Sequence, residues 1–248
     1  MIQSYKLFCI FGRVCSLLAR SELSADYFVK HKNMKKLLAL LLTFTVMTLS
    51  SNATDTKRIR LNAPQTDRGL AVMQAFKNRH SERQWADSLV TMQDLSDLLW
   101  AADGVNRPNG KRTAPSAMGK NDVDIYVFTP DGVYLYIPDG HELQLVASGD
   151  NRAMVVGGQP GFETLPPLAL VYTSTPSRFG IADTQAANIL GYIDGGMVSE
   201  NVGVCCAGLG LVNVPRYSMD REAIAKLLGL PEGTLLVLND LVGYPVTH

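Results

Sequence analysis

Two arginines and a serine lie close together at residues 79–83, in the order Arg-His-Ser-Glu-Arg. A guanidinium presents a planar fork of N–H donors that matches phosphate oxygens, and a hydroxyl adds another donor. Backbone N–H groups at the following turn would complete such a phosphate cradle. The same residue types also form ordinary solvated helix ends. Taken alone, these five residues are compatible with both interpretations.

Two helices are predicted on either side of this segment. Residues 67–79 place apolar side chains at helical spacing, with Asp67 as the N-cap. Residues 91–104 begin with Thr91 and Asp94 at the spacing of a capping box and end at a glycine. The Arg-His-Ser-Glu-Arg segment therefore ends one helix and precedes the next.

Beyond these helices the pattern predicts strands mixed with further helices. A polar loop over 105–122, rich in Gly, Pro, Asn and Lys, carries the run Arg-Thr-Ala-Pro-Ser-Ala at 112–117. Strands are predicted at 123–129, 133–138, 166–173, 209–214 and 234–241, and helices at 183–208 and 218–229, with a possible kink at the Gly195-Gly196 pair. Because helices and strands alternate without strict βαβ repetition, we expect a single α+β domain.

Charge is unevenly distributed along the 248 residues, although the formal net charge is zero. Residues 1–53 contain seven Lys and Arg against two Asp and Glu, and residues 54–248 contain sixteen against twenty-one, a net of −5. An acidic body argues against nucleic acid as a partner. No metal-ligand pattern is predicted.

The basic leader has the composition of a signal peptide that begins at Met34. Two lysines form the charged start, an apolar run covers 37–49, and small residues precede a cleavage site after Ala53. The run is short for a membrane span, so we expect export to the periplasm or cell envelope and no stable span after cleavage. An uncleaved N-terminal anchor is the alternative.

The expected domain organisation follows from this leader. Residues 1–33 are a doubtful extension upstream of a mis-assigned start, 34–53 the signal peptide, 54–66 a polar linker and 67–248 the folded domain. Within that domain only Cys205 and Cys206 remain, which we interpret as small buried apolar residues rather than a redox pair. Trp85, Trp100 and Phe162 are predicted to belong to the core or an interface.

Several separated motifs resemble the nitroreductase-like FMN flavoproteins, including their SagB-type dehydrogenase relatives. The segment 79–83 resembles the family's N-terminal FMN-phosphate motif, and 112–117 resembles its second flavin loop. Glu-Asn at 200–201 and the glycine-rich run 207–210 resemble the family's long interface helix and its exit. The runs 228–233 and 243–245 resemble its C-terminal helix end and last strand.

The resemblance implies a nitroreductase-like fold, with a mostly antiparallel sheet flanked by helices, and an obligate homodimer that binds FMN at the subunit interface. Its flavin carries the redox chemistry, so no catalytic side chain is named. The cofactor-binding residues implied are Arg79, His80, Ser81 and Arg83 for the phosphate and ribityl end, Arg112, Pro115 and Ser116 in the second loop, and Leu211, Val212 and Asn213 beside the ring.

Two features depart from the family pattern. Many relatives place a basic residue after the Gly-Tyr-Pro segment, whereas this chain ends in Val-Thr-His, which puts more of the phosphate binding on the arginines. An exported enzyme would also lack the cytoplasmic nicotinamide donors.

The sequence therefore favours an exported FMN-dependent oxidoreductase that passes hydride or electrons, by a ping-pong mechanism, from a small-molecule donor to an electron-poor organic acceptor. A SagB-type dehydrogenase that oxidises a substrate through FMN, and a flavin- or ligand-binding envelope protein without turnover, remain alternatives.

Overall fold

The computed structural model describes residues 57–162 and 164–246, which build one seven-stranded sheet covered by helices on both faces. The strand order is β1-β4-β3-β2-β5-β7-β6, and every neighbouring pair is antiparallel. The strands are β1 (Arg58–Arg60), β2 (Val123–Phe128), β3 (Gly132–Ile137), β4 (Glu142–Ser148), β5 (Leu168–Ser174), β6 (Val212–Arg216) and β7 (Leu235–Gly243). This confirms the predicted α+β domain with its antiparallel sheet.

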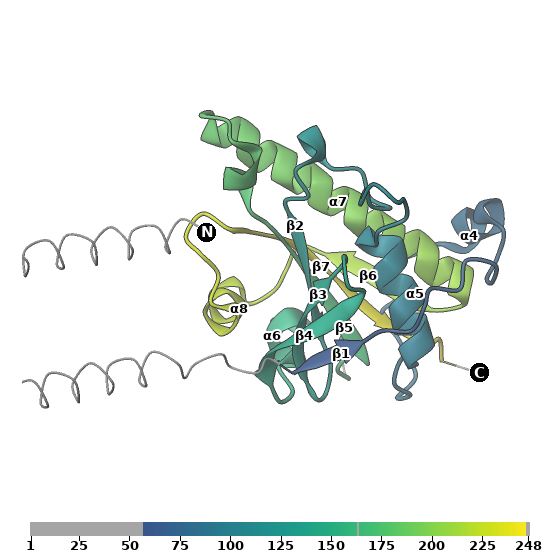
Figure 1. The fold of residues 1–248 in the computed structure, drawn as a ribbon. Helices are drawn as coiled ribbons and strands as arrows, with labels where there is room; N and C mark the ends of the chain where they lie inside the picture. The colour runs from purple at the N-terminus through teal and green to yellow at the C-terminus, as the bar shows by residue number, and fades with distance from the viewer. Residues whose placement is uncertain (1–56, 163, 247–248) are drawn as a thin grey trace, which may run out of the picture. The chain divides into compact units, whose positions relative to one another are not determined.

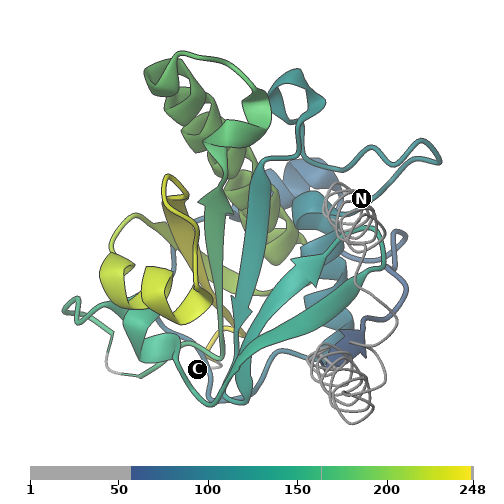
Figure 2. The same cartoon turned by 60° about the vertical axis from the view of Figure 1, so that its left-hand side comes forward.

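The helices divide into two layers (Figures 1 and 2). They are α4 (Val72–Asn78), α5 (Met92–Asp103), α6 (Arg152–Val156), α7 (Thr184–Leu209) and α8 (Arg221–Leu228), with short 3-10 turns η1 (Ala117–Gly119) and η2 (Pro176–Phe179). Helices α5 and α7 pack their apolar side chains on one face of the sheet, and α6 and α8 on the other. The sheet therefore has a separate hydrophobic core on each face.

Helix α7 approaches the sheet closely because two of its sheet-facing positions lack side chains. A Cβ on Gly195 would lie 2.7 Å from Cγ1 of Val237 in β7, and a Cβ on Gly191 would lie 2.3 Å from Oγ of Ser174 in β5. The expected kink at Gly195-Gly196 is absent from α7, which continues over 26 residues. Gly191 and Gly195 thus allow close approach of the helix to the sheet.

The helix ends match the sequence in part. Thr91 caps α5 as predicted, since its hydroxyl accepts the N–H of Asp94. Helix α4 begins later than predicted and has Ala71, not Asp67, at its N-cap. The reason is Gly69, whose φ of +89° breaks the helix, while the N–H of Leu70 donates to the carbonyl of Gly208 on α7.

Three elements were not predicted, and one cap was misplaced. Strand β1 lies inside the expected linker 54–66, so part of that linker belongs to the sheet, where β1 pairs with β4. Strand β4 alternates polar and apolar side chains over 142–145, a period-2 pattern that was overlooked. Helix α6 is too short to show periodicity. Helix α8 is capped by Asp220 rather than Ser218, because the Asp220 carboxylate accepts the N–H of Ala223.

No helix within the described ranges is both long and apolar enough to cross a membrane. The predicted signal peptide at 34–53, the extension 1–33 and the C-terminal His248 all lie outside the residues that the structure describes.

The close approach of α7 gives a test by substitution. We expect Gly195→Ala to lower the free energy of unfolding, because overpacking costs about 1–3 kcal/mol and alanine returns at most about 1 kcal/mol of helix propensity. Gly196→Ala is the matched control, since a Cβ there meets nothing within 4 Å. Urea unfolding at one protein concentration measures both, and equal stability of the two variants would contradict the account.

Candidate functional site

The segment 79–83 is docked on the edge strand β6. Arg79 ends α4, with its N–H donating to the carbonyl of Ala75 at 2.8 Å. Ser81 forms a parallel bridge with Asn213, and the N–H of Glu82 donates to the Asn213 carbonyl at 2.9 Å. Two parts of the predicted cofactor site, 79–83 and 211–213, are therefore adjacent, although more than 120 residues separate them in the sequence.

The side chain of Arg79 runs along α7. A Cβ on Gly203 would lie 3.7 Å from Arg79 Cδ and 3.7 Å from Asn213 Nδ2, so both side chains lie near this point of the helix. Arg79 Nε lies 3.9 Å from Glu200 Oε1, and the two side chains are 35% and 61% exposed. Such an exposed pair is weak. The guanidinium can therefore exchange it for an anionic ligand.

The remaining residues of the segment are arranged differently from the predicted cradle. The N–H groups of Arg83 and Gln84 both donate to the carboxylate of Glu82, at 2.6 and 3.0 Å. These backbone hydrogen bonds lower the pKa of Glu82, with a smaller contribution from His80. His80 is exposed, and its Nδ1 lies 2.7 Å from the Asn78 carbonyl. The backbone donors after the segment are thus already used by the protein.

Arg112 does not lie with the other arginines. Its Nη1 donates to Asp103 Oδ2 at 2.5 Å, and the two side chains are only 14% and 8% exposed. Burial raises the pKa of Asp103 to about 6 even though the Arg112 charge opposes the shift. A buried carboxylate therefore occupies the Arg112 guanidinium in this protomer, and the role of Arg112 in cofactor binding stays a prediction.

Pro115 and Ser116 belong to a turn fixed against the middle of α7. The Ser116 hydroxyl accepts the N–H of Asn121 at 2.8 Å, and the Ala117 N–H donates to Asp194 Oδ2 of α7 at 2.7 Å. Pro115 is exposed. Asp194 and Gly203 are nine residues apart, which is roughly 13 Å along a helix axis. Within one protomer, this turn and Arg79 therefore lie apart.

Residues 211–213, which lead into and begin β6, are only partly available to a ligand. Leu211 is buried, and its N–H donates to the Cys206 carbonyl at 2.8 Å. Val212 is half-buried, and Asn213 is 3% exposed with its amide donating to Asp240. The Leu211 N–H therefore cannot donate to a flavin while it donates to the Cys206 carbonyl.

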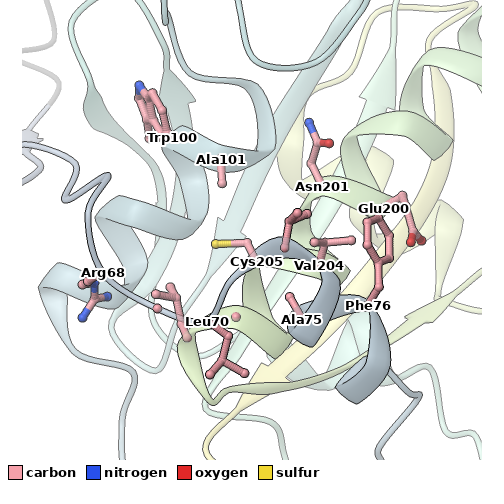
Figure 3. A pocket seen from close by; sticks show the side chains of 14 residues that line it. Arg68, Leu70, Ala75, Phe76, Trp100, Ala101, Glu200, Asn201, Val204 and Cys205 are labelled. Atoms are coloured by element: carbon pink, nitrogen blue, oxygen red, sulfur yellow. The ribbon is translucent and has the colours of Figure 1, made fainter.

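An apolar groove of about 590 Å³ lies between α4, α5 and α7 (Figure 3). Across it, Asn201 and Cys205 of α7 face Trp100 and Ala101 of α5, while Phe76 of α4 lies beside Glu200. The groove thus ends near Arg79, which pairs with Glu200.

The predicted core positions are confirmed for Trp85 and Cys206, which are buried, whereas Trp100 and Cys205 are half-buried and line the groove. Trp85 is buried and stacks on Phe162 at 5.8 Å between ring centroids. Trp100 donates its Nε1–H to the Val105 carbonyl at the groove. Both cysteines are free thiols, and burial raises the pKa of Cys205 to about 12, so it stays protonated near neutral pH.

Three groups near the site were not predicted. Asp240 is fully buried beneath Asn213. Arg216 lies close enough to Arg83 for that charge to add to the effect of burial, which lowers the Arg216 pKa. Asp122 and Asp194 form a buried carboxyl pair behind Ser116. The polar pair Asn-Asp at 239–240 lies inside an otherwise apolar strand, and this sequence feature could have revealed Asp240.

Comparison with known proteins agrees with this arrangement. The family model described as "Nitroreductase family" matches residues 76–244. The chain belongs to the nitroreductase family. This membership makes it, in general terms, an oxidoreductase of the flavin-dependent type.

Two relatives show the extent of the similarity. A candidate nitroreductase of Methanocaldococcus jannaschii is 28% identical over 169 residues, which cover 64% of this chain and 85% of that protein. The crystal structure of a candidate nitroreductase from Ralstonia eutropha is 32% identical, covers 79% of this chain and 93% of that chain, and has a TM-score of 0.72.

A third likeness concerns the fold alone. A chain of the E. coli microcin synthetase complex with a truncated precursor bound matches at 15% identity, with a TM-score of 0.59, over 92% of this nitroreductase-family chain and 100% of that chain.

The carboxyl pair gives a test by pH. Burial and the hydrogen bond to Asp194 raise the pKa of Asp122 from 3.8 to about 6. The folded protein then holds this proton more tightly than the unfolded chain, so its stabilising effect is complete below pH 3.8 and is lost as pH rises through about 6.

We therefore expect the stability of Asp122→Asn, relative to the unsubstituted protein, to improve between pH 4 and 7, because asparagine cannot ionise. Thermal or urea unfolding across this range measures it. Asp150→Asn is the control, because Arg152 lowers the pKa of Asp150 and its effect falls below pH 4. A pH-independent difference for Asp122→Asn would show that the pair holds no extra proton.

Proposed function

We propose that this protein is an exported, FMN-dependent oxidoreductase of the nitroreductase type that acts as a homodimer. The observation that carries the proposal is the docking of segment 79–83 on β6 at Asn213, in a chain that belongs to this family. The proposal is supported because the N–H donors of the half-buried Arg79 and the hydroxyl of the exposed Ser81 lie beside the strand that would pass the flavin ring.

The residues present fit a phosphate at this position. Ser81 is exposed, and among the described residues Arg79 forms one weak ion pair, with Glu200. Arg83 is also exposed. Arg216 is buried and donates to Val155, Val156 and Gln159, so it would contribute only its nearby charge.

The protein's own groups would bind and orient the cofactor. Charge-assisted hydrogen bonds from Arg79, with Ser81, would hold the phosphate, and the backbone of 212–213 would lie along the ring. A bound flavin supplies reversible two-electron transfer, so that donor and acceptor react in turn as in a ping-pong mechanism. The acceptor class we propose is an electron-poor organic molecule.

An exposed apolar stripe supports the homodimer. Four residues at helical spacing on the outer face of α7 are 40–51% exposed: Ile189, Tyr192, Ile193 and Met197. Exposed apolar residues of α4, among them Met73 and Phe76, extend it. A patch of this kind is typical of a protein interface. The turn at 115–116 lies apart from Arg79 of its own protomer. A second copy would explain this separation if the turn of one protomer contributes to the site of the other.

Export rests on the predicted signal peptide at 34–53. N-terminal sequencing of the native protein should find a start after Ala53, and an intact start at Met1 or Met34 would contradict it.

The visible spectrum of the purified protein tests the function. We expect a yellow protein with bound FMN, bleached by an electron donor and restored by a quinone or nitroaromatic acceptor. A protein that stays colourless after FMN is added would refute flavin binding. A yellow protein that no donor reduces would indicate a binding protein without turnover, and reduction only by an azoline-type substrate would favour the SagB-type reaction.

Arg79→Ala should weaken FMN binding, because hydrogen bonds to charged groups contribute about 1.5–3 kcal/mol. Arg58→Ala is the control with the same change in charge, since Arg58 lies in β1 at the opposite edge of the sheet. Fluorescence titration measures both dissociation constants. Equal affinities of the two variants for FMN would argue against a phosphate site at Arg79.

Ile193→Asp should convert a dimer into monomers, because a charge would be buried in the α7 stripe. Leu89→Asp, a change at an exposed residue before α5, should leave the dimer intact. Light scattering after size-exclusion chromatography measures the masses. A monomeric unsubstituted protein would contradict the proposed assembly.

A further inference from the structure

Asp240, in the middle of β7, is a fully buried carboxylate held by hydrogen bonds from three elements. Tyr172 Oη of β5 and Ser199 Oγ of α7 donate to its Oδ2 at 2.8 and 2.7 Å. Asn213 Nδ2 of β6 donates to its Oδ1 at 2.7 Å. No Lys or Arg among the described residues forms an ion pair with it. The two hydroxyls fix the carboxylate so that Oδ1 is aimed at Asn213.

Asn213 contacts segment 79–83, which we call the phosphate segment. Its carbonyl accepts the Glu82 N–H, its backbone bridges Ser81, and its amide lies beside the stem of Arg79 at Gly203. A shift of Asn213 would therefore move the backbone of the segment and the neighbouring arginine together.

Strand β6 is the edge of the sheet and pairs only with β7, over Val212–Arg216. Pro215, opposite Asp240, has no N–H to donate to a neighbouring strand. Side chains of β7 add to this backbone pairing at two points. At the far end of β6, Asn239 Nδ2 donates to the carbonyls of Arg216 and Ser218, both at 3.1 Å, and beside segment 79–83 Asp240 accepts the amide of Asn213.

We propose that Asp240 is a positioning residue for the phosphate segment 79–83 and acts on it through Asn213. The inference rests on the proposed function, since the ligand it positions for is the FMN phosphate. Asp240 itself does not touch the ligand. It fixes the Asn213 side chain, and the Asn213 backbone fixes Ser81 and Glu82.

The test compares the affinities for FMN and for riboflavin, which lacks the phosphate. Asp240→Ala should weaken FMN binding by about tenfold or more, the effect of one hydrogen bond to a charged group, and riboflavin binding by a smaller factor, because riboflavin shares only the ring contacts of 212–213. Asp240→Asn, which keeps an acceptor oxygen for Asn213, should restore most of the FMN affinity. A general loss of stability would not separate the two flavins.

Tyr172→Phe is the matched control, because it removes one hydrogen bond from the same carboxylate at the side away from β6. It should destabilise the protein but leave FMN affinity unchanged. The proposal is overturned if Asp240→Ala binds FMN normally, if both flavins lose affinity equally, or if Tyr172→Phe loses FMN affinity to the same extent. Should Asp240→Ala not fold, Asn213→Ala must show the same selective loss of FMN affinity, and normal FMN binding by it overturns the proposal.

Hydrogen exchange separates this inference from the proposed function. If the unsubstituted protein binds no FMN, the proposed function fails, and the amide of Glu82 still reports on positioning in the flavin-free protein. Its exchange should be faster in Asp240→Ala, or in Asn213→Ala, than in Tyr172→Phe. Equal rates would overturn the positioning role independently of any cofactor.

Discussion

The direct packing of α7 on the sheet is the constraint on which the rest of the structure depends. Because Gly191 and Gly195 lack side chains, the helix backbone lies against Ser174 and Val237. Two polar contacts follow from this position along one helix. Asp194 binds the N–H of Ala117 in the 115–117 turn, and Ser199 donates to the buried Asp240. Helix α7 therefore positions the turn and the Asp240 network, while β6 positions segment 79–83.

The same geometry explains how the site is divided. The 79–83 segment and the 115–116 turn lie more than two helical turns apart on α7, and an apolar stripe covers the outer face of that helix over 189–197. In our proposal a second copy brings its own turn to the phosphate segment. One protomer then supplies the anion-binding half of the site, and the buried hydrogen bonds of Asp240 hold that half in position.

Local patterns in the sequence predicted much of the fold and part of the site. The Thr91 N-cap, the β2–β3 hairpin and the long helix follow from short-range rules, and the structure has all three. The docking of Ser81 on Asn213 could be expected only through the family resemblance, because the contact is long-range. Short elements such as β1 and α6 were missed, since three to five residues carry no clear period.

Contacts with a buried partner were not visible in the sequence. Arg112 has the right residue type for a phosphate, and Asp103 binds its guanidinium, because the loop that follows α5 brings the two together. Glu82 likewise uses backbone donors that seemed free. The Asp240 network combines residues from four elements, so no spacing rule could reveal its role.

A crystal structure of the protein with FMN tests the central claim most directly. The account predicts a dimer in which the phosphate contacts Arg79 and Ser81 of one protomer, with Asn213 still bonded to Asp240, and in which the 115–116 turn near the flavin comes from the partner. A phosphate bound away from segment 79–83, or a site completed by the turn of the same protomer, would contradict it.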